Sequence, residues 1–271
     1  MAYKLIAMDL DGTLLTTQKE ISPRTLETLI RVQQQGVKIV LASGRPTHGI
    51  TPMADRLRLN EFEGYLLAYN GGKITDYKTL EAVYQKTLES SLLPYLYQCA
   101  KDNHLTIVTY HDEFVITENP DDPYVQKEAI LNVMQFMHVP NFLEAIRFPI
   151  NKCMIVGDPA VLVRLEKEMQ EALKDKMGVF RSEPYFLELV PKGIDKALSL
   201  DVLLKKLNLT KDNLMACGDG YNDLSMIEFA GLGVAMANAQ PIVKDHANFI
   251  TLTNDQDGVA YAVDKFVMGE G

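Results

Sequence analysis

The sequence has only three cysteines, no long apolar run and no excess of basic residues. Cys99, Cys153 and Cys217 lie far apart, which excludes a disulfide framework and the ligand spacing of a zinc site. We expect them to be reduced core residues. No apolar stretch approaches the ~18 residues that a membrane helix needs, and the N-terminus leads into a strand rather than a signal peptide. These absences predict a cytoplasmic protein that does not bind a membrane.

The charge balance argues against nucleic acid as a partner. The chain carries 36 acidic and 27 basic residues, for a net charge of -9, whereas binding to nucleic acid or to anionic lipid requires a basic surface. A small anionic substrate held through a metal ion remains compatible with this charge. The length of 271 residues and the 47% of hydrophobic residues indicate one large or two modest globular domains.

Two aspartates, Asp9 and Asp11, directly follow the first apolar run, Leu5–Met8, which is expected to form a buried strand. Side chains at positions i and i+2 of an extended chain point the same way, so both carboxylates could project into one small region. Like charges at such a distance repel each other unless a cation or a shared proton intervenes. The pair therefore indicates a divalent metal and an acid–base pair, while a turn with two solvated acids is the alternative.

Strand and helix patterns alternate at both ends of the chain. A helix is expected to begin at Ser22-Pro23, with the serine as N-cap, and to end at Gly36. A second helix is expected over residues 195–207. Buried strands are expected at residues 37–42, 65–69, 214–217 and 234–236. Strands separated by helices in this way predict a parallel sheet with right-handed crossovers.

The middle of the chain has a different pattern, typical of an α+β unit. Residues 105–109 and 113–117 predict an antiparallel hairpin. The remaining expected elements are helices at residues 92–101, 124–137 and 158–174 and strands at residues 152–156, 179–182 and 186–190. The predicted fold class is α/β, with one parallel-sheet domain built from residues 1–82 and 189–271 and an α+β domain inserted at residues 83–188.

Polar residues follow three of the expected parallel strands. Ligands bind beyond the carboxyl ends of the strands in open parallel sheets, so these residues could share one site. They are Asp9 and Asp11, then Ser43 and Gly44, and finally Asp219, Asn222 and Asp223. Carboxylates without clustered His or Cys suit Mg²⁺ better than zinc. A hydroxyl, free backbone N–H groups and a lysine suit a phosphate. The set fits phosphoryl transfer with an aspartate nucleophile.

At these residues the chain resembles the haloacid dehalogenase superfamily, and in particular its Cof-like phosphatases with a C2B-type cap. Four family motifs occur in order, and they lie at Asp9–Leu15, Ser43–Arg45, Lys196 and Gly218–Asp223. The stretch from Pro184 to Glu188 and the Asn70-Gly71 turn also resemble this subfamily. The resemblance covers nearly the whole chain and implies a Rossmann-like core with an inserted cap that closes over the substrate.

The resemblance also implies roles for individual residues. Asp9 would be the nucleophile, and Asp11 would act first as general acid and then as general base. Asp9, the backbone carbonyl of Asp11 and Asp219 would hold Mg²⁺, with support from Asp223. The implied substrate-binding residues are Leu10, Ser43, Gly44, Arg45, Lys196 and Asn222.

Four assignments have alternatives. Lys192 also lies near the start of the helix that carries Lys196, but Lys196 follows the short Gly-x-x step of the family, and Lys192 is expected to be a solvated loop residue. Arg45 could contact substrate or pair with a carboxylate. Asn70 could face the leaving group or simply form a turn. His111, at the expected hairpin tip, could reach over the site from the inserted domain, but it is expected to be a surface turn residue.

The sequence thus predicts a Mg²⁺-dependent phosphatase that hydrolyses small phosphorylated metabolites, with sugar phosphates foremost, through an aspartyl-phosphate. A phosphomutase and a non-catalytic module that binds phosphometabolites are the alternatives. We expect a monomer or a small homo-oligomer.

Overall fold

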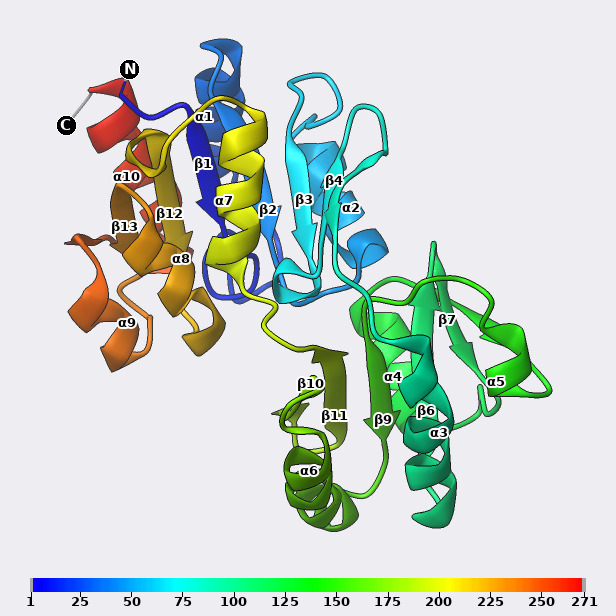
Figure 1. Cartoon of the computed structure of the whole chain (residues 1–271). Helices are drawn as coiled ribbons and strands as arrows, with labels where there is room; N and C mark the ends of the chain where they lie inside the picture. Colours follow the sequence, from blue (N-terminus) through cyan, green and yellow to red (C-terminus); the bar gives the residue numbers. More distant parts are fainter. Residues whose placement is uncertain (1, 270–271) are drawn as a thin grey trace. The chain divides into compact units, whose positions relative to one another are not determined.

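The computed structural model describes residues 2–269, and its internal contacts divide the chain into two units (Figure 1). One unit contains the chain up to Tyr84 and again from Asp195 onward, and the other is Gln85–Ile194. The sequence placed the boundaries at 82/83 and 188/189, which lie two and six residues before those of the structure. Strand β5 (Ala82–Gln85) is part of the first unit's sheet, and strand β11 (Phe186–Pro191) runs unbroken through the sheet of the second.

The first unit, here called the core unit, is built on an eight-stranded sheet in the order β14-β13-β12-β1-β2-β3-β4-β5. Six neighbouring strands, from β14 to β3, are parallel, as the alternation of strands and helices predicts. Besides β5, the strands of this sheet are β1 (Leu5–Met8), β2 (Lys38–Ala42), β3 (Tyr65–Ala68), β4 (Lys73–Asp76), β12 (Leu214–Gly218), β13 (Leu232–Ala235) and β14 (Phe249–Ile250). The four residues of β1 are apolar and buried because both faces of the sheet are covered.

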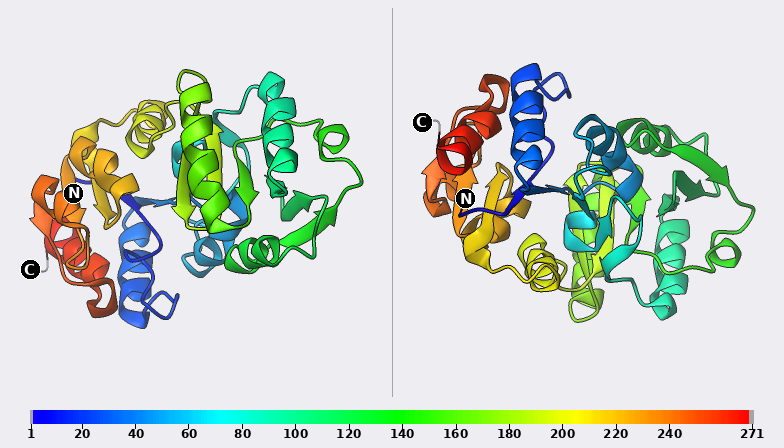
Figure 2. Two further views of the ribbon diagram at one scale, coloured as in Figure 1. Left: turned by 90° about the horizontal axis from the view of Figure 1, so that it is seen from below. Right: turned by 90° about the horizontal axis from the view of Figure 1, so that it is seen from above.

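Helices cover both faces of this sheet (Figures 1 and 2). Helices α7 and α8 lie on one face, and α1, α2 and α10 lie on the other. Helix α1 begins where the sequence predicts, since the Ser22 hydroxyl accepts a hydrogen bond from the Thr25 N–H and Pro23 is the first helical residue. The helices are α1 (Pro23–Gln34), α2 (Thr47–Arg56), α7 (Lys196–Lys206), α8 (Leu224–Phe229), α9 (Pro241–His246) and α10 (Gly258–Val263).

Strand register brings three distant loops together. Met8 at the end of β1 lies opposite Leu41 of β2 on one side and Cys217 of β12 on the other. Because the three strands are parallel, the loops that follow them emerge at the same edge of the sheet. These loops begin at Asp9, Ser43 and Asp219. The central position of β1 therefore places all three polar loops of the sequence side by side.

The second unit, here called the inserted unit, contains a six-stranded sheet in the order β10-β11-β9-β6-β7-β8. The predicted hairpin is confirmed, because β6 and β7 pair antiparallel. The remaining elements are β6 (Thr106–His111), β7 (Phe114–Thr117), β8 (Gln135–His138), β9 (Cys153–Val156), β10 (Met177–Glu183), α3 (Leu93–Asp102), α4 (Pro123–Leu131), α5 (Phe142–Ala145) and α6 (Pro159–Leu173).

The helix predicted over residues 124–137 is wrong in its second half. Helix α4 ends at Leu131, because Val133 takes a left-handed φ of 54° and the Met134 N–H returns to the Ala129 carbonyl. The chain then forms β8, which pairs parallel with β7 at the edge of the sheet. The apolar residues of β8 suggested a continuing helix, but they are partly exposed rather than packed on a helix face.

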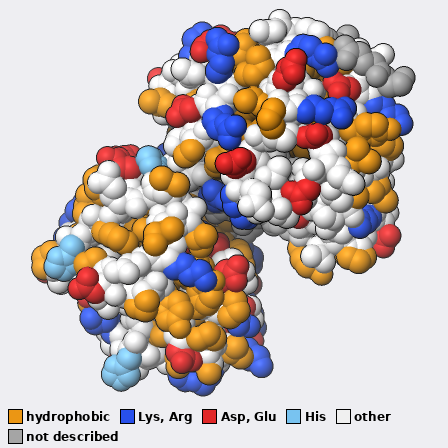
Figure 3. Space-filling model, turned by 180° about the vertical axis from the view of Figure 1, so that it is seen from behind, with side chains coloured by type: hydrophobic (Ala, Val, Ile, Leu, Met, Phe, Trp, Pro, Cys, Tyr) orange, Lys and Arg blue, Asp and Glu red, His pale blue; other side chains and the backbone are white. Residues whose placement is uncertain are grey.

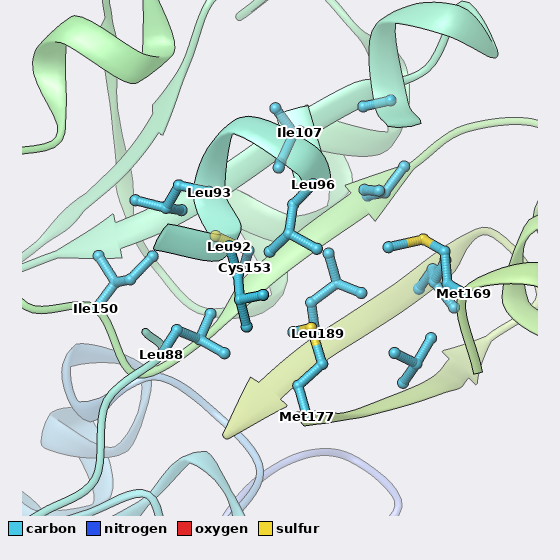
Figure 4. Packing of buried hydrophobic residues seen from close by; sticks show 14 of the residues in the cluster. Leu88, Leu92, Leu93, Leu96, Ile107, Ile150, Cys153, Met169, Met177 and Leu189 are labelled. Carbon is cyan, nitrogen blue, oxygen red and sulfur yellow. The ribbon is translucent and has the colours of Figure 1, made fainter. Parts of the chain in front are cut away.

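One apolar cluster holds the inserted unit together (Figure 4). Leu96 of α3 and Met169 of α6 are buried against Cys153 of β9 and Leu189 of β11. Burial of a leucine or methionine side chain is worth about 1.5–3 kcal/mol, so this cluster accounts for much of the unit's stability. The core unit has its own buried cluster, in which Leu200 and Leu203 of α7 pack against β1 residues such as Leu5.

The surface carries acidic and basic side chains interspersed with apolar ones on the face shown in Figure 3. Within residues 2–269, no helix combines the length and the apolar character that crossing a bilayer requires.

The cysteines give a test of the packing. Cys153 and Cys217 are buried, and burial raises the pKa of both thiols to about 12, whereas Cys99 is half-buried. Since the thiolate is the reactive form, we expect at most one thiol of the native protein to react with Ellman's reagent near neutral pH, and three after denaturation. A Cys99→Ser variant should abolish the native reaction. Rapid reaction of two or three native thiols would contradict this packing.

Candidate active site

Asp9 lies at the edge where the three loops meet. Its backbone N–H donates to the Cys217 carbonyl at 3.1 Å, which extends the pairing of β1 with β12 by one residue beyond the strand. This bond fixes the backbone of Asp9. Its carboxylate is 9% exposed and faces Lys196 of α7. An acidic side chain so deeply buried requires a partner, and this partner comes from 187 residues further along the chain.

Lys196 is the first residue of α7, and its side chain is completely buried. The N-cap Asp195 begins the helix by accepting a hydrogen bond from the Leu198 N–H. The Lys196 Nζ donates to Asp9 Oδ1 at 2.7 Å, to Asp223 Oδ1 at 2.6 Å and to the Ala42 carbonyl at 2.9 Å. All three ammonium protons are therefore used, and one side chain connects the loops after β1 and β12 with the last residue of β2.

Asp219 and Asp223 come from the loop after β12. Carboxylate oxygens of Asp9, Asp219 and Asp223 lie within 4.8 Å of one another. Asp223 Oδ2 accepts hydrogen bonds from the N–H groups of Asp219 and Gly220, so both of its oxygens are engaged and it shapes the loop. Asp219 Oδ1 accepts from the Thr13 hydroxyl at 2.7 Å.

Gly12 allows the first loop to approach Asp219. Its φ of +84° lies in the left-handed region, and a Cβ at this position would overlap the Asp219 carboxylate. The Gly12 carbonyl also accepts a hydrogen bond from Asn238 Nδ2 at 2.8 Å. The glycine is therefore required twice, for its backbone conformation and for the space beside Asp219.

The acidic cluster carries more negative charge than the protein neutralises. If all three carboxyls are ionised, they face one ammonium, which leaves two negative charges without a countercharge in the described cluster. Burial, together with the nearby Asp223 carboxylate, raises the pKa of Asp9 to about 8 although Lys196 opposes the shift. Burial likewise raises the pKa of Asp219 to about 6. For Lys196, burial would lower the pKa, but the carboxylates of Asp223 and Asp9 outweigh it and raise it. An oxygen-only donor set with this charge deficit fits a hard divalent cation.

Asp11 lies outside this cluster and is bound by two basic side chains. Arg45 contacts it in a forked arrangement, with Nε at 3.0 Å from Oδ2 and Nη2 at 2.8 Å from Oδ1, and Lys19 Nζ lies 2.8 Å from Oδ1. Burial would raise the pKa of Asp11, but Arg45 and Lys19 together lower it. Of the two alternatives for Arg45, the structure displays the pairing with a carboxylate. Lys19 has a left-handed φ of 61° and was not expected from the sequence.

The residues expected to bind phosphate lie around the same edge. The Ser43 hydroxyl accepts a hydrogen bond from the Arg45 N–H at 3.2 Å, and the Ser43 backbone N–H donates to the Leu67 carbonyl. Asn222 is exposed and donates from Nδ2 to Asn70 Oδ1 at 3.0 Å. The side chain of Leu10 is buried, so only its main chain is available to a ligand.

Two residues discussed from the sequence lie in the inserted unit and not in this cluster. Lys192 pairs with Asp175 at 3.4 Å, while His111 is exposed and stacks on Phe148 with a centroid distance of 4.0 Å. Sequence reasoning missed two residues of the site. Thr13 donates a hydrogen bond to Asp219, and Asn238 donates one to the Gly12 carbonyl. Thr13 lies within the first motif, so its hydroxyl was an available signal, whereas Asn238 lies outside all four motifs.

An oxygen-rich acidic cluster beside a buried lysine, at the carboxyl edge of a parallel sheet, defines an enzyme site for an anionic group such as a phosphoryl group. Comparison with known proteins specifies the family. Residues 6–263 match the family of haloacid dehalogenase-like hydrolases. The chain belongs to this family, and it is one of the family's phosphatases.

Three relatives illustrate the similarity. The 5-amino-6-(5-phospho-D-ribitylamino)uracil phosphatase YcsE of Bacillus subtilis is 31% identical over 271 residues, which covers 98% of this chain and 96% of the relative. A haloacid dehalogenase-like hydrolase from Bacteroides thetaiotaomicron is 57% identical, with a TM-score of 0.94 over 97% of this chain and 99% of the other. The subclass IIB sugar phosphatase BT4131, at 23% identity, shares the fold with a TM-score of 0.81 over 97% of this chain and 98% of its own.

The raised pKa values of Asp9 and Asp219 predict that protons and a divalent cation compete. Between about pH 4 and about pH 8, Asp9 and Asp219 of the folded metal-free protein retain protons that they have lost in the unfolded chain, so the contribution of these two groups to stability falls as the pH rises through this range. Cation binding displaces these protons. We therefore expect Mg²⁺ to raise the melting temperature more at about pH 8 than at about pH 5.5.

Thermal unfolding with Mg²⁺ or with EDTA at both pH values measures the effect. Asp219→Asn should reduce the Mg²⁺-dependent shift, and Asp175→Asn, which changes an exposed carboxylate of the inserted unit, should leave it intact. An equal shift at both pH values would contradict the competition.

Proposed function

We propose that the protein is a Mg²⁺-dependent phosphatase of small phosphorylated metabolites, with sugar phosphates foremost, and that it acts through an aspartyl-phosphate on Asp9. The observation that carries this proposal is the Asp9 carboxylate, which is fixed by Lys196 at 2.7 Å within a buried acidic cluster. The activity of the relative YcsE on a phosphorylated ribityl compound supports the substrate class.

Asp9 is well placed to act as a nucleophile. One carboxylate oxygen, Oδ1, is bound by Lys196, and no described residue donates a hydrogen bond to the other oxygen. The free oxygen can attack phosphorus while the bound one keeps the carboxylate oriented. The bond from phosphorus to the alcohol oxygen then breaks as the bond to Asp9 forms.

Asp9 and Asp219, with the backbone carbonyl of Asp11, would hold the Mg²⁺, and Asp223 would support them. When bound, Mg²⁺ supplies the positive charge that lets a carboxylate and a phosphate dianion approach each other. Lys196 supplies the only ammonium within the described acidic cluster and offsets charge on the phosphoryl oxygens. Ser43, Gly44, Arg45 and Asn222 would complete the phosphate site.

Asp11 would transfer the proton in each of the two steps, which are the formation and the hydrolysis of the aspartyl-phosphate. Its pKa, lowered by Arg45 and Lys19, suits the second step. In that step water attacks phosphorus as the bond from phosphorus to the Asp9 oxygen breaks, and the ionised Asp11 carboxylate takes the proton from the water. The first step, in which the aspartyl-phosphate forms, requires a protonated Asp11, which gives its proton to the departing alcohol oxygen. Asp11 must therefore be released from Arg45 before it can act as an acid, and an incoming phosphate dianion competes for the same guanidinium.

The covalent step is tested by Asp9→Asn. This substitution preserves shape but removes the nucleophilic charge, so kcat should fall by at least about 10³-fold. Release of inorganic phosphate from p-nitrophenyl phosphate measures the loss, and Asp175→Asn is the matched control with unchanged activity. Metal-dependent activity that survives in the Asp9→Asn variant would disprove the covalent mechanism.

The substrate class is tested by screening phosphorylated metabolites with Mg²⁺ and with EDTA. We expect kcat/KM to be highest for sugar phosphates and activity to be lost in EDTA. Phosphate release without interconversion of sugar-phosphate isomers distinguishes a phosphatase from a phosphomutase. Isomer interconversion without phosphate release would contradict the proposal.

A further inference from the structure

The loop after β3 contacts three segments of the candidate site, namely the loop after β2, the start of α7 and the loop after β12. Its residues Tyr69, Asn70 and Gly71 have φ angles of 55°, 54° and 101°, which places three successive residues in the left-handed region. Two of them carry side chains, for which this conformation is unfavourable. Strain of this kind persists only where surrounding contacts impose it, and it gathers at functional sites.

The loop's backbone is fixed against the loop that follows β2. The Tyr69 N–H donates to the Arg45 carbonyl and the Asn70 N–H donates to the Ser43 carbonyl, both at 3.0 Å. Gly71 packs directly on the start of α7, where a Cβ would overlap the Asp195 carbonyl, one residue before Lys196. These contacts hold the Asn70 backbone in place from two sides.

The Asn70 side chain is consequently directed at two residues expected to bind phosphate. Its amide lies against Gly44, where a Cβ would be only 3.0 Å from Nδ2. Its Oδ1 accepts the hydrogen bond from Asn222 Nδ2 at 3.0 Å. On its other side, the Asn222 Oδ1 lies against Gly220, where a Cβ would be 2.6 Å away. Asn222 is exposed, so these contacts are what limits its rotation.

We propose that Asn70 is a positioning residue for Asn222. By accepting one N–H of the Asn222 amide, it fixes which end of that amide faces the site and leaves the second N–H of Nδ2 for a phosphoryl oxygen. Asn70 acts through Asn222 and has no role of its own in bond making. The inference rests on the proposed function in one respect, namely that Asn222 binds the phosphoryl group.

A double-mutant cycle tests this role. Asn70→Gly removes the side chain but tolerates the left-handed backbone, so it separates the amide from the loop conformation. We expect Asn70→Gly and Asn222→Ala each to lower kcat/KM for p-nitrophenyl phosphate by about tenfold, and the double variant to be no worse than Asn222→Ala alone. Inhibition by inorganic phosphate should weaken in the same non-additive pattern.

Asn208→Gly is the matched control, because Asn208 also has a left-handed φ, of 55°, but follows the far end of α7. This variant should retain full activity, and the melting temperatures of all variants report on folding. Effects of Asn70→Gly and Asn222→Ala that multiply, or an unchanged kcat/KM in Asn70→Gly, would overturn the positioning role. If the positioning role fails but the Asp9→Asn variant is inactive, the proposed function still stands. If the Asp9→Asn variant is active, the proposed function itself is disproved.

Discussion

The buried contact of Lys196 with Asp9 and Asp223 is the interaction on which the rest of the site depends. The three hydrogen bonds of Lys196, at 2.6–2.9 Å, connect the loops after β1 and β12 with the last residue of β2. Loss of one partner from a buried ion pair costs about 3–5 kcal/mol, because the remaining charge has no solvent. The segments that carry these residues can therefore not separate without a large loss of stability, and this contact keeps Asp9, the proposed nucleophile, in a fixed orientation.

The same contact leaves the site short of positive charge. The charge of Lys196 compensates only one of the three carboxylates, and the raised pKa values of Asp9 and Asp219 are consistent with this excess of negative charge. Arg45 and Lys19 could have supplied the missing charge, but both bind Asp11 instead. The protein thus separates its two kinds of carboxylate. One group, in which Asp9 and Asp223 are buried and Asp219 is half-buried, is deficient in cations. The other, Asp11, is half-buried and held by basic side chains, and this difference suits different tasks within one reaction.

Much of this could be predicted from the sequence, for reasons that are physical. The strands at Leu5–Met8 and Lys38–Ala42 are short apolar runs buried on both faces, and Ser22-Pro23 begins a helix through its own hydrogen bond. Parallel pairing then places the polar ends of the strands together. The sequence-based predictions fail where tertiary contacts determine the local structure. The segment after Leu131 has helical periodicity, yet pairing with β7 makes it a strand. The Lys19–Asp11 contact depends on a turn geometry that no motif encodes.

The division of the chain has a consequence for the order in which the protein folds during synthesis. The inserted unit is one continuous segment, Gln85–Ile194, and it encloses its own apolar cluster. It can fold as soon as it leaves the ribosome. The core sheet cannot, because β1 lies between β2 and β12, and β12 emerges only after the whole inserted unit. Until then one edge of β1 lacks its neighbour and Asp9 lacks Lys196. The first strand to be synthesised is therefore among the last to acquire its full set of contacts.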